Sequence, residues 1–154
     1  MPGEVPSDVQ FMRLALQQAE QARRGGEVPV GAVLVQEGRV VATGANRPIG
    51  TDDPTAHAEV EAIRSGGRSL GSYRLTNTTL YVTLEPCPMC ASAIVHARVR
   101  RLVFGAWDRR AGAAGSVIDL FSLPGLNHRV DVFGGVLMEE CAGLLKAFFA
   151  GRRL

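Results

Sequence analysis

Two short motifs, thirty positions apart, constrain this chain more than any other feature of its sequence. The first is His57-Ala58-Glu59, and the second is Pro86-Cys87-Pro88-Met89-Cys90. Imidazole nitrogen and thiolate sulfur are ligands that zinc prefers, and His57, Cys87 and Cys90 supply three of them. A structural zinc is normally closed by four protein ligands, whereas a catalytic zinc keeps one position open for water. Three ligands beside a spare carboxylate therefore predict a hydrolytic zinc site.

Glu59 is the residue expected to move protons at this site. Zinc lowers the pKa of a bound water from about 15.7 to about 7, so that hydroxide becomes available near neutral pH. Glu59 lies two residues beyond His57, and its carboxylate can therefore reach the bound water without displacing a ligand. We predict that Glu59 acts as the proton shuttle.

Each motif alone has simpler explanations. A lone Cys-x-x-Cys can be a redox pair, half of a structural zinc site or a chance occurrence, and a lone His-x-Glu is weaker still. The two motifs together, with a proline before the first cysteine and a strand-to-helix context, match the signature of zinc-dependent base deaminases.

Three other residues bear on the number of ligands. Cys141 sits in an apolar helical pattern and is expected to be a small core residue. His96 lies six residues past Cys90 on the same predicted helix. That separation is about 9 Å along the helix axis, so His96 should point away from the metal. His128 stands in a predicted loop and stays a candidate fourth ligand.

The hydrophobic pattern predicts helices that alternate with strands. Ser7 with Gln10 resembles the capping box of a first helix that ends before Gly25. Residues 30–35 and 39–43 are β-rich and are predicted to form a hairpin. The helix after His57 is expected to stop at Gly66-Gly67, and a strand at 80–84 leads into the helix that carries the two cysteines.

The rest of the chain completes an α/β pattern. Strands are predicted at 101–105 and 129–133, and a last helix from about Met138 to Phe149. This order predicts a single domain over residues 1–154, a three-layer α/β/α sandwich around a mixed sheet of about five strands. The metal residues should cluster at one edge of that sheet.

The segment from residue 106 to residue 128 is longer than most connections. It contains Asp108-Arg109-Arg110 and then a glycine-rich stretch from Gly112 to Ser116. Long loops inside compact domains are usually functional or partly structured. The segment is predicted to form one wall of a substrate pocket, with arginines that meet phosphate. The alternative is a surface excursion with one short helix around 117–121.

Bulk charge alone does not identify a nucleic-acid binder, because the net charge is only +2. However, 16 of the 17 basic residues are Arg, and they cluster at 98–101, Arg109-Arg110 and Arg152-Arg153. Arginine suits phosphate and can stack on bases, although a GC-rich genome gives the same composition. No signal peptide or membrane-spanning stretch is evident, so a cytoplasmic protein without membrane contact is expected.

Motifs along nearly the whole chain resemble those of the bacterial tRNA-specific adenosine deaminases, members of the cytidine deaminase-like superfamily. The segments that carry the resemblance are 28–35, Asn46-Arg47-Pro48, 53–59, 83–87, Phe104-Gly105, Asp108, 112–116 and 127–129. The zinc motifs are similar to those of the superfamily, and the flanking segments are similar to those of its tRNA branch.

The resemblance implies hydrolysis of the 6-amino group of adenosine at the wobble position of an arginine tRNA, giving inosine and ammonia. It implies one Zn²⁺ per subunit on the three ligands, with Glu59 as the proton shuttle. It also implies a homodimer that contacts the anticodon stem-loop with both subunits, with residues 90–98 at the interface.

The resemblance assigns roles to six further residues. Asn46 and the amide of Ala58 would hold the flipped nucleoside, Asp108 would contact a neighbouring ribose, and Arg110 would belong to the same substrate loop. Phe149 and Arg152 would contact the anticodon loop from the last helix. The simpler alternatives are that Asn46 shapes a turn, Asp108 caps a helix and Phe149 fills the core.

Two rival functions follow from the same residues. A deaminase of this fold could act on guanine, cytosine or a free nucleoside, since the metal chemistry is shared across the superfamily. A zinc-stabilised binding module without catalysis is the rival from a different class.

Overall fold

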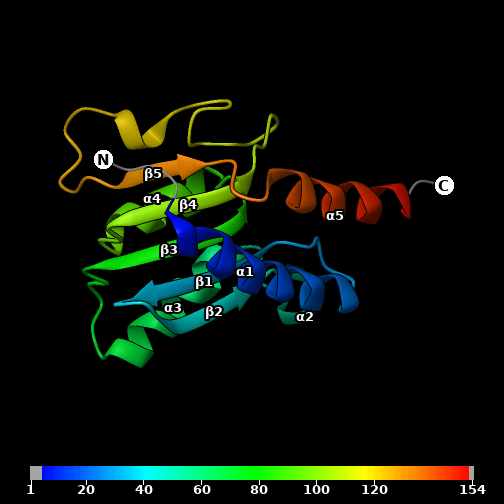
Figure 1. Cartoon of the computed structure of the whole chain (residues 1–154), viewed down its shortest axis with the longest axis horizontal. Helices are drawn as coiled ribbons and strands as arrows, with labels where there is room; N and C mark the ends of the chain where they lie inside the picture. Colours follow the sequence, from blue (N-terminus) through cyan, green and yellow to red (C-terminus); the bar gives the residue numbers. More distant parts are fainter. Residues whose placement is uncertain (1–4, 153–154) are drawn as a thin grey trace.

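The computed structural model describes residues 5–152, so Arg153 of the last arginine cluster lies outside the described residues. Figure 1 shows the arrangement of its elements along the chain. The elements are α1 (Pro6–Arg24), β1 (Gly31–Gln36), β2 (Arg39–Ala45), α2 (Pro48–Thr51), α3 (Ala58–Leu70), β3 (Thr78–Leu84), α4 (Pro88–His96), β4 (Arg101–Ala106), the 3₁₀ helix η1 (Leu120–Ser122), β5 (Asp131–Gly134) and α5 (Met138–Ala150).

The five strands form one mixed sheet in the order β2-β1-β3-β4-β5. Strand β1 pairs antiparallel with β2 and β3, whereas β3 with β4 and β4 with β5 are parallel pairs. Glu37 and Gly38 join β1 to β2 with φ values of 51° and 76°. Positive φ at both central residues is the geometry of a two-residue hairpin turn that follows the twist of the strands. The predicted hairpin and mixed sheet are confirmed.

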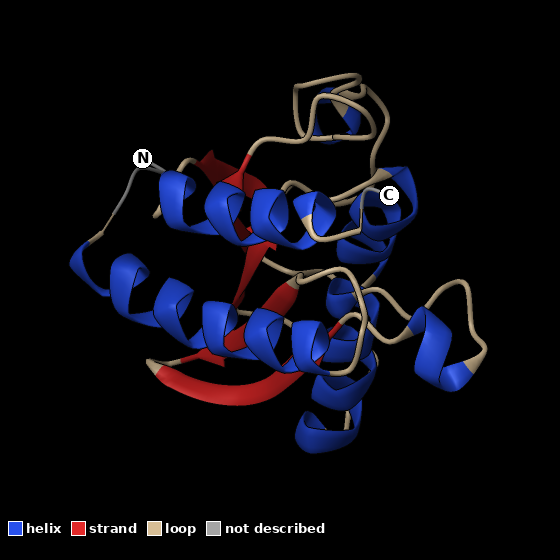
Figure 2. Ribbon diagram, turned by 90° about the vertical axis from the view of Figure 1, so that its right-hand side faces the viewer, coloured by secondary structure: helices blue, strands red, loops and turns tan. Residues whose placement is uncertain are grey.

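Helices cover both faces of the sheet, as the three-layer prediction requires. On one face, Val33 and Val103 share a buried cluster with Met12 of α1 and Cys141 of α5. On the other face, Leu34 and its neighbours on β3 and β4 share a larger cluster with residues of α3 and α4. The layers can be followed in Figure 2, where α1 and α5 run beside each other over one face of the sheet.

The first helix begins differently from its prediction. The capping box of Ser7 and Gln10 is wrong, because Pro6 already occupies the first helical position and Val5 is the N-cap. The fixed φ of proline suits that first position, and this start places Asp8 three residues after the cap. The Asp8 carboxylate accepts a hydrogen bond from the Val5 amide at 2.8 Å.

Asp8 also ties the start of α1 to the middle of the sheet. Its side chain is 0% exposed, and it accepts a hydrogen bond from the Tyr81 hydroxyl at 2.7 Å. The Arg101 guanidinium donates to its two carboxylate oxygens at 2.8 and 2.7 Å. Burial by itself raises the pKa of Asp8, but hydrogen bonds from Arg101, Val5 and Tyr81 outweigh it and hold that pKa below its ordinary value of 3.8.

We expect Asp8→Asn to lower the free energy of unfolding at pH 7 by about 3 kcal/mol, the lower end for a broken buried ion pair. The folded pKa of Asp8 is depressed, so its contribution is complete above the unfolded pKa and is lost as pH falls through the folded pKa. Urea denaturation of the parent chain and of Asp8→Asn should therefore show that the difference between their free energies of unfolding becomes smaller as the pH falls. The exposed Asp52→Asn is the control and should stay within about 0.5 kcal/mol of the parent chain. A variant as stable as the parent at pH 7 would contradict the prediction.

Two other expectations are corrected. The helix after His57 runs through Gly66-Gly67 and ends at Gly71, which has a φ of 65°. Gly66 does not stop the helix but allows close packing, because a Cβ there would lie 2.5 Å from Leu34 Cδ2. The short helix expected around 117–121 is a 3₁₀ turn at Leu120–Ser122. No helix within residues 5–152 is both long and apolar enough to span a membrane.

Candidate metal centre

The three predicted ligands come from the starts of α3 and α4, which lie on the same face of the sheet. His57 is the N-cap of α3, and Cys87 is the N-cap of α4. Pro88 occupies the first position of α4, where its missing N–H costs nothing, and Cys90 follows within the same turn. Because free backbone amides gather at helix N-termini, this placement favours thiolate ligands.

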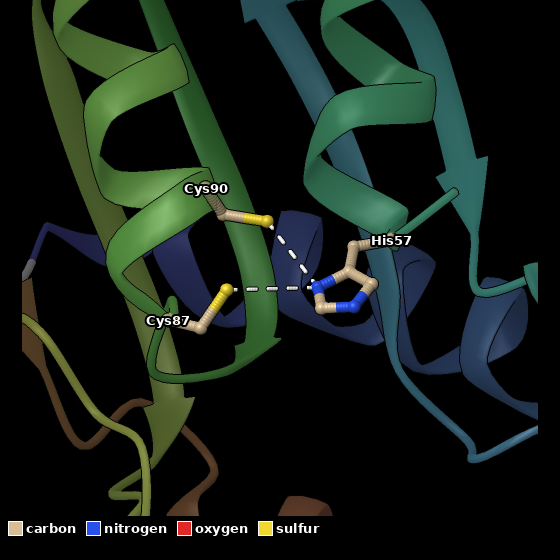
Figure 3. A group of neighbouring side chains, drawn as sticks. All are labelled: His57, Cys87 and Cys90. Atoms are coloured by element: carbon tan, nitrogen blue, oxygen red, sulfur yellow. Dashed lines mark hydrogen bonds between the residues drawn. The ribbon is translucent and has the colours of Figure 1, made fainter. Parts of the chain in front are cut away.

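The ligand atoms converge on one point. The Nδ1 atom of His57 lies 3.6 Å from Cys87 Sγ and 3.5 Å from Cys90 Sγ, and all three ligand atoms lie within 4.8 Å of one another. Figure 3 shows both sulfurs facing that ring nitrogen. Zn–S bonds of about 2.3 Å and Zn–N bonds of about 2.0 Å at a tetrahedral angle give an S···N separation of about 3.5 Å. The donor set therefore fits zinc in both chemistry and spacing.

The other candidate ligands lie elsewhere. His96 is exposed at the end of α4, and His128 Nε2 lies 2.7 Å from the Val99 carbonyl oxygen. Cys141 is buried against the backbone of Gly105, as expected for a core residue. Within residues 5–152, no further His, Cys, Asp or Glu joins the group of three. The described residues therefore leave one position of a tetrahedral zinc for water or substrate.

Glu59 lies in the first turn of α3 and is 4% exposed. Burial, assisted by the negative charge of Cys87, raises the pKa of Glu59 to about 7. A carboxyl group with a pKa near neutrality can both take up and release a proton at physiological pH. The position and the environment of Glu59 thus suit the predicted proton shuttle.

The three ligand side chains are linked to one another by hydrogen bonds. A hydrogen bond from Cys90 lowers the pKa of Cys87, and the same bond together with burial raises the pKa of Cys90. The hydrogen bond with Cys87 raises the pKa of His57. Zinc needs deprotonated thiolates and a neutral imidazole, so its binding must expel the protons held by Cys90 and, in acid, by His57.

We therefore expect zinc affinity to rise by at least about tenfold per pH unit, because the Cys90 proton must be released on binding. The increase of affinity with pH should be steeper wherever His57 is also protonated, since a second proton must then be expelled. Competition with a zinc-chelating dye between pH 5.5 and 8.5 measures this dependence. Calorimetry in buffers of different ionisation enthalpy counts the protons directly, and an affinity independent of pH would contradict the expectation.

Asn46 and Ala58, the two residues predicted to hold the nucleoside, lie in direct contact. The Ala58 amide donates to Asn46 Oδ1 at 2.8 Å, so the Asn46 side chain caps the start of α3. The backbone amide of Asn46 donates to the Val30 carbonyl at 3.1 Å, which fixes the residue just after β2. This contact places the Asn46 carboxamide against the backbone amide of Ala58, the residue that follows the ligand His57.

Asp108 lies directly after β4, in the loop predicted to form a pocket wall. Its Oδ1 atom accepts hydrogen bonds from the amides of Arg110 at 3.0 Å and Ala111 at 3.3 Å. Asp108 therefore caps this turn, as the simpler alternative predicted, but it uses only one of its carboxylate oxygens to do so. The other oxygen makes no hydrogen bond to residues 5–152. The Arg110 side chain is exposed on the same turn.

Phe149 and Arg152 lie at the far end of α5, on the face of the sheet opposite α3 and α4. Phe149 is 49% exposed and meets the Phe148 ring edge to face, so it does not fill the core. The Arg152 guanidinium stacks over the Phe148 ring at 4.4 Å and donates to the Gly26 carbonyl at 2.8 Å. These contacts join the end of α5 to the end of α1, and they leave an exposed aromatic ring beside a cation.

Sequence reasoning gave no role to Glu85, which the structure places between the metal helix and the Asp108 loop. Its carboxylate is buried and accepts hydrogen bonds from the backbone of Asp108, Ala114 and Ser116. The sequence feature that could have indicated this role is an acidic residue at the end of an apolar strand, two residues before the first cysteine.

A family model described as the cytidine and deoxycytidylate deaminase zinc-binding region matches residues 6–106. A tRNA-specific adenosine deaminase of Haemophilus influenzae is 52% identical and covers 95% of this chain and 85% of its own. A protein of the same description from Bacillus subtilis is 46% identical and covers 92% of this chain and 88% of its own.

Solved structures agree with the sequence relatives. One, from work on A-to-I editing by tRNA:A34 deaminases at the wobble position of transfer RNA, is 49% identical with a TM-score of 0.86. It covers 88% of this chain and 99% of its own. The guanine deaminase of Bacillus subtilis is 35% identical with a TM-score of 0.63 and covers 94% of this chain and 93% of its own.

Proposed function

Because the chain belongs to the cytidine and deoxycytidylate deaminase family, and within it to the tRNA-specific adenosine deaminases, we propose that it converts adenosine to inosine at the wobble position of tRNA. The reaction consumes one water and releases ammonia from C6 of the purine. The expected cognate substrate is an arginine tRNA in the cytoplasm. The observation that carries this proposal is the three-ligand site with a buried acid beside it, in a chain 52% identical to a tRNA-specific adenosine deaminase.

The chemistry divides between the metal and Glu59. A zinc ion held by His57, Cys87 and Cys90 would supply a water activated at neutral pH. Glu59 takes the proton of the attacking water and delivers it to the ring nitrogen next to C6. The same carboxyl then takes the remaining proton from the hydroxyl added at C6 and gives it to the amino group, so the C6–N bond breaks, ammonia leaves and the C6 carbonyl of inosine forms. The pKa of about 7 suits both transfers.

Substrate recognition is assigned to residues around this centre and at the end of α5. Asn46 and the Ala58 amide hold the purine edge of a nucleoside flipped out of the anticodon loop. Asp108 contacts a neighbouring ribose, whose 2′-hydroxyl distinguishes RNA from DNA, and Arg110 meets phosphate on the same loop. The exposed Phe149 ring and Arg152 contact the anticodon loop from α5, and the protein acts as a homodimer with residues 90–98 at the interface.

The test is to incubate the zinc-loaded protein with the anticodon stem-loop of an arginine tRNA and to sequence the product for inosine. Ammonia release from guanine, cytosine and free adenosine is measured in parallel. Guanine is included because a guanine deaminase shares the fold at 35% identity. Inosine at the wobble position supports the proposal. Turnover of guanine without any inosine in the stem-loop would overturn it.

A further inference from the structure

Glu85 has the strongest set of unexplained contacts outside the metal centre. It follows β3 directly and is 2% exposed, although its side chain ends in a carboxyl group. A buried carboxylate is costly unless its oxygens accept hydrogen bonds. The Glu85 carboxylate meets this requirement entirely through one segment, the loop from Asp108 to Ser116.

Four donors from that loop surround the carboxylate. The Asp108 amide donates to Oε1 at 2.9 Å, and the Ser116 hydroxyl donates to the same oxygen. The amides of Ala114 and Ser116 donate to Oε2 at 2.9 and 3.0 Å. An ionised carboxylate accepts about four hydrogen bonds, so this side chain is saturated by the loop.

The backbone around Glu85 extends the same link to the metal helix. The Pro86 carbonyl accepts a hydrogen bond from the Ala113 amide at 2.8 Å, and the next residue is the ligand Cys87. Gly112 allows the loop to approach this closely, because a Cβ at Gly112 would lie 2.3 Å from the Glu85 carboxyl carbon. The loop is thus held directly against the strand end that leads to the metal.

We propose that Glu85 is a positioning residue for RNA recognition, which fixes the Asp108 loop relative to the metal centre. The Asp108 amide bonded to Glu85 belongs to the residue assigned to the ribose, so the carboxylate sets where that residue stands. The proposal rests on the proposed function, because it assigns Asp108 to a ribose of the substrate. Glu85 touches neither the metal nor the reacting atoms and acts only through the loop.

The first test replaces Glu85 with Gln, which keeps the size but turns an NH₂ group toward backbone donors. We expect zinc content near one per chain and about a tenfold to hundredfold loss of kcat/KM on the anticodon stem-loop, as misplacement of binding groups produces. A stem-loop with deoxyribose beside the target adenosine provides the specific readout. In the parent enzyme, the ratio of kcat/KM for the ribose stem-loop to kcat/KM for the deoxyribose stem-loop should be well above one. In Glu85→Gln this ratio should fall toward one.

A second readout does not depend on activity. Arg109 and Arg110 are exposed in the loop, so trypsin can report its order. Cleavage there should be slow in the parent protein and at least about tenfold faster in Glu85→Gln, since local opening exposes the segment.

Gly112→Ala retains Glu85 but should also speed trypsin cleavage of the loop and reduce the ribose preference. It replaces Glu85→Gln as the test variant if Glu85→Gln fails to fold. Gly143→Ala is the matched control, because a Cβ at Gly143 of α5 meets nothing within 4 Å. It should leave cleavage, zinc content and ribose preference unchanged.

The outcomes separate the two proposals. An unchanged cleavage rate and an unchanged ribose preference in both Glu85→Gln and Gly112→Ala would overturn the role of Glu85. Loss of zinc in proportion to activity would also overturn it, because Glu85 would then act on the metal. If the parent protein forms no inosine, the proposed function fails and the RNA role of Glu85 fails with it, whereas the cleavage rates still decide whether Glu85 holds the loop.

Discussion

Glu59→Gln is expected to abolish inosine formation while the protein keeps its zinc. Glutamine has nearly the same size as glutamate but cannot carry a proton from water to the purine. General acid–base catalysis contributes about 10² to 10⁴ in rate, and the proposed role of Glu59 covers both the attack and the departure of ammonia, so a loss near the upper end is expected. Inosine formation on the stem-loop gives the rate, and metal analysis gives the zinc content.

A second variant accompanies Glu59→Gln. Glu59→Ala tests whether the loss comes from the missing proton carrier, and it should be as inactive as Glu59→Gln. Glu59 is outside the group of three ligands, so both variants should bind zinc at the stoichiometry of the parent protein. A variant that keeps zinc and deaminates at the parental rate would show that another group moves the proton. A zinc-stabilised binding module would keep its biological function in both variants.

Cys90→Ser is expected to lose zinc and, with it, all measurable turnover. Cys90 Sγ lies 3.5 Å from His57 Nδ1 within the ligand group, and a serine hydroxyl is a poor zinc ligand at neutral pH. A metal that activates water stabilises the transition state by several kcal/mol, so a loss of at least about a thousandfold follows. Zinc per chain after dialysis and the rate of inosine formation are the two measurements.

Cys141→Ala is the matched control for the cysteine substitution. Cys141 is as buried as Cys90 but packs against Gly105 on the opposite face of the sheet. It should keep zinc and activity and lose only about 1 kcal/mol of stability, as is usual for a small core change. Retention of stoichiometric zinc by Cys90→Ser, or its loss from Cys141→Ala, would contradict the assignment of the ligands.

The sequence predicted well the features that depend on local pattern. The hairpin at Glu37-Gly38, the alternation of strands and helices, and the convergence of His57 with the two cysteines all follow from short motifs with a fixed geometric requirement. A zinc ion needs its three protein ligands close together, so the ligand types alone predict that two motifs thirty positions apart lie in contact.

The errors and omissions arise where the partner of a residue lies far along the chain. The burial of Asp8 is not evident from local sequence, because its partners Tyr81 and Arg101 are 73 and 93 residues away. Gly66 reads as a helix stop until the side chain of Leu34 is known to press against it. In the sequence, Glu85 resembles an ordinary acidic residue next to a motif. Its hydrogen bonds to the loop from Asp108 to Ser116 are evident only in the folded structure.

Under the proposed roles of Asn46 and Ala58, their mutual contact would make purine recognition an exchange of hydrogen bonds. The Ala58 amide proposed to meet the purine already donates to the Asn46 carboxamide, so it is not an unpaired donor before a substrate binds. An incoming base gains only the difference between its own bond and the one it displaces. A base whose acceptor cannot replace that bond would therefore gain little from the Ala58 amide, whereas a well-placed acceptor would release the Asn46 carboxamide for a second contact.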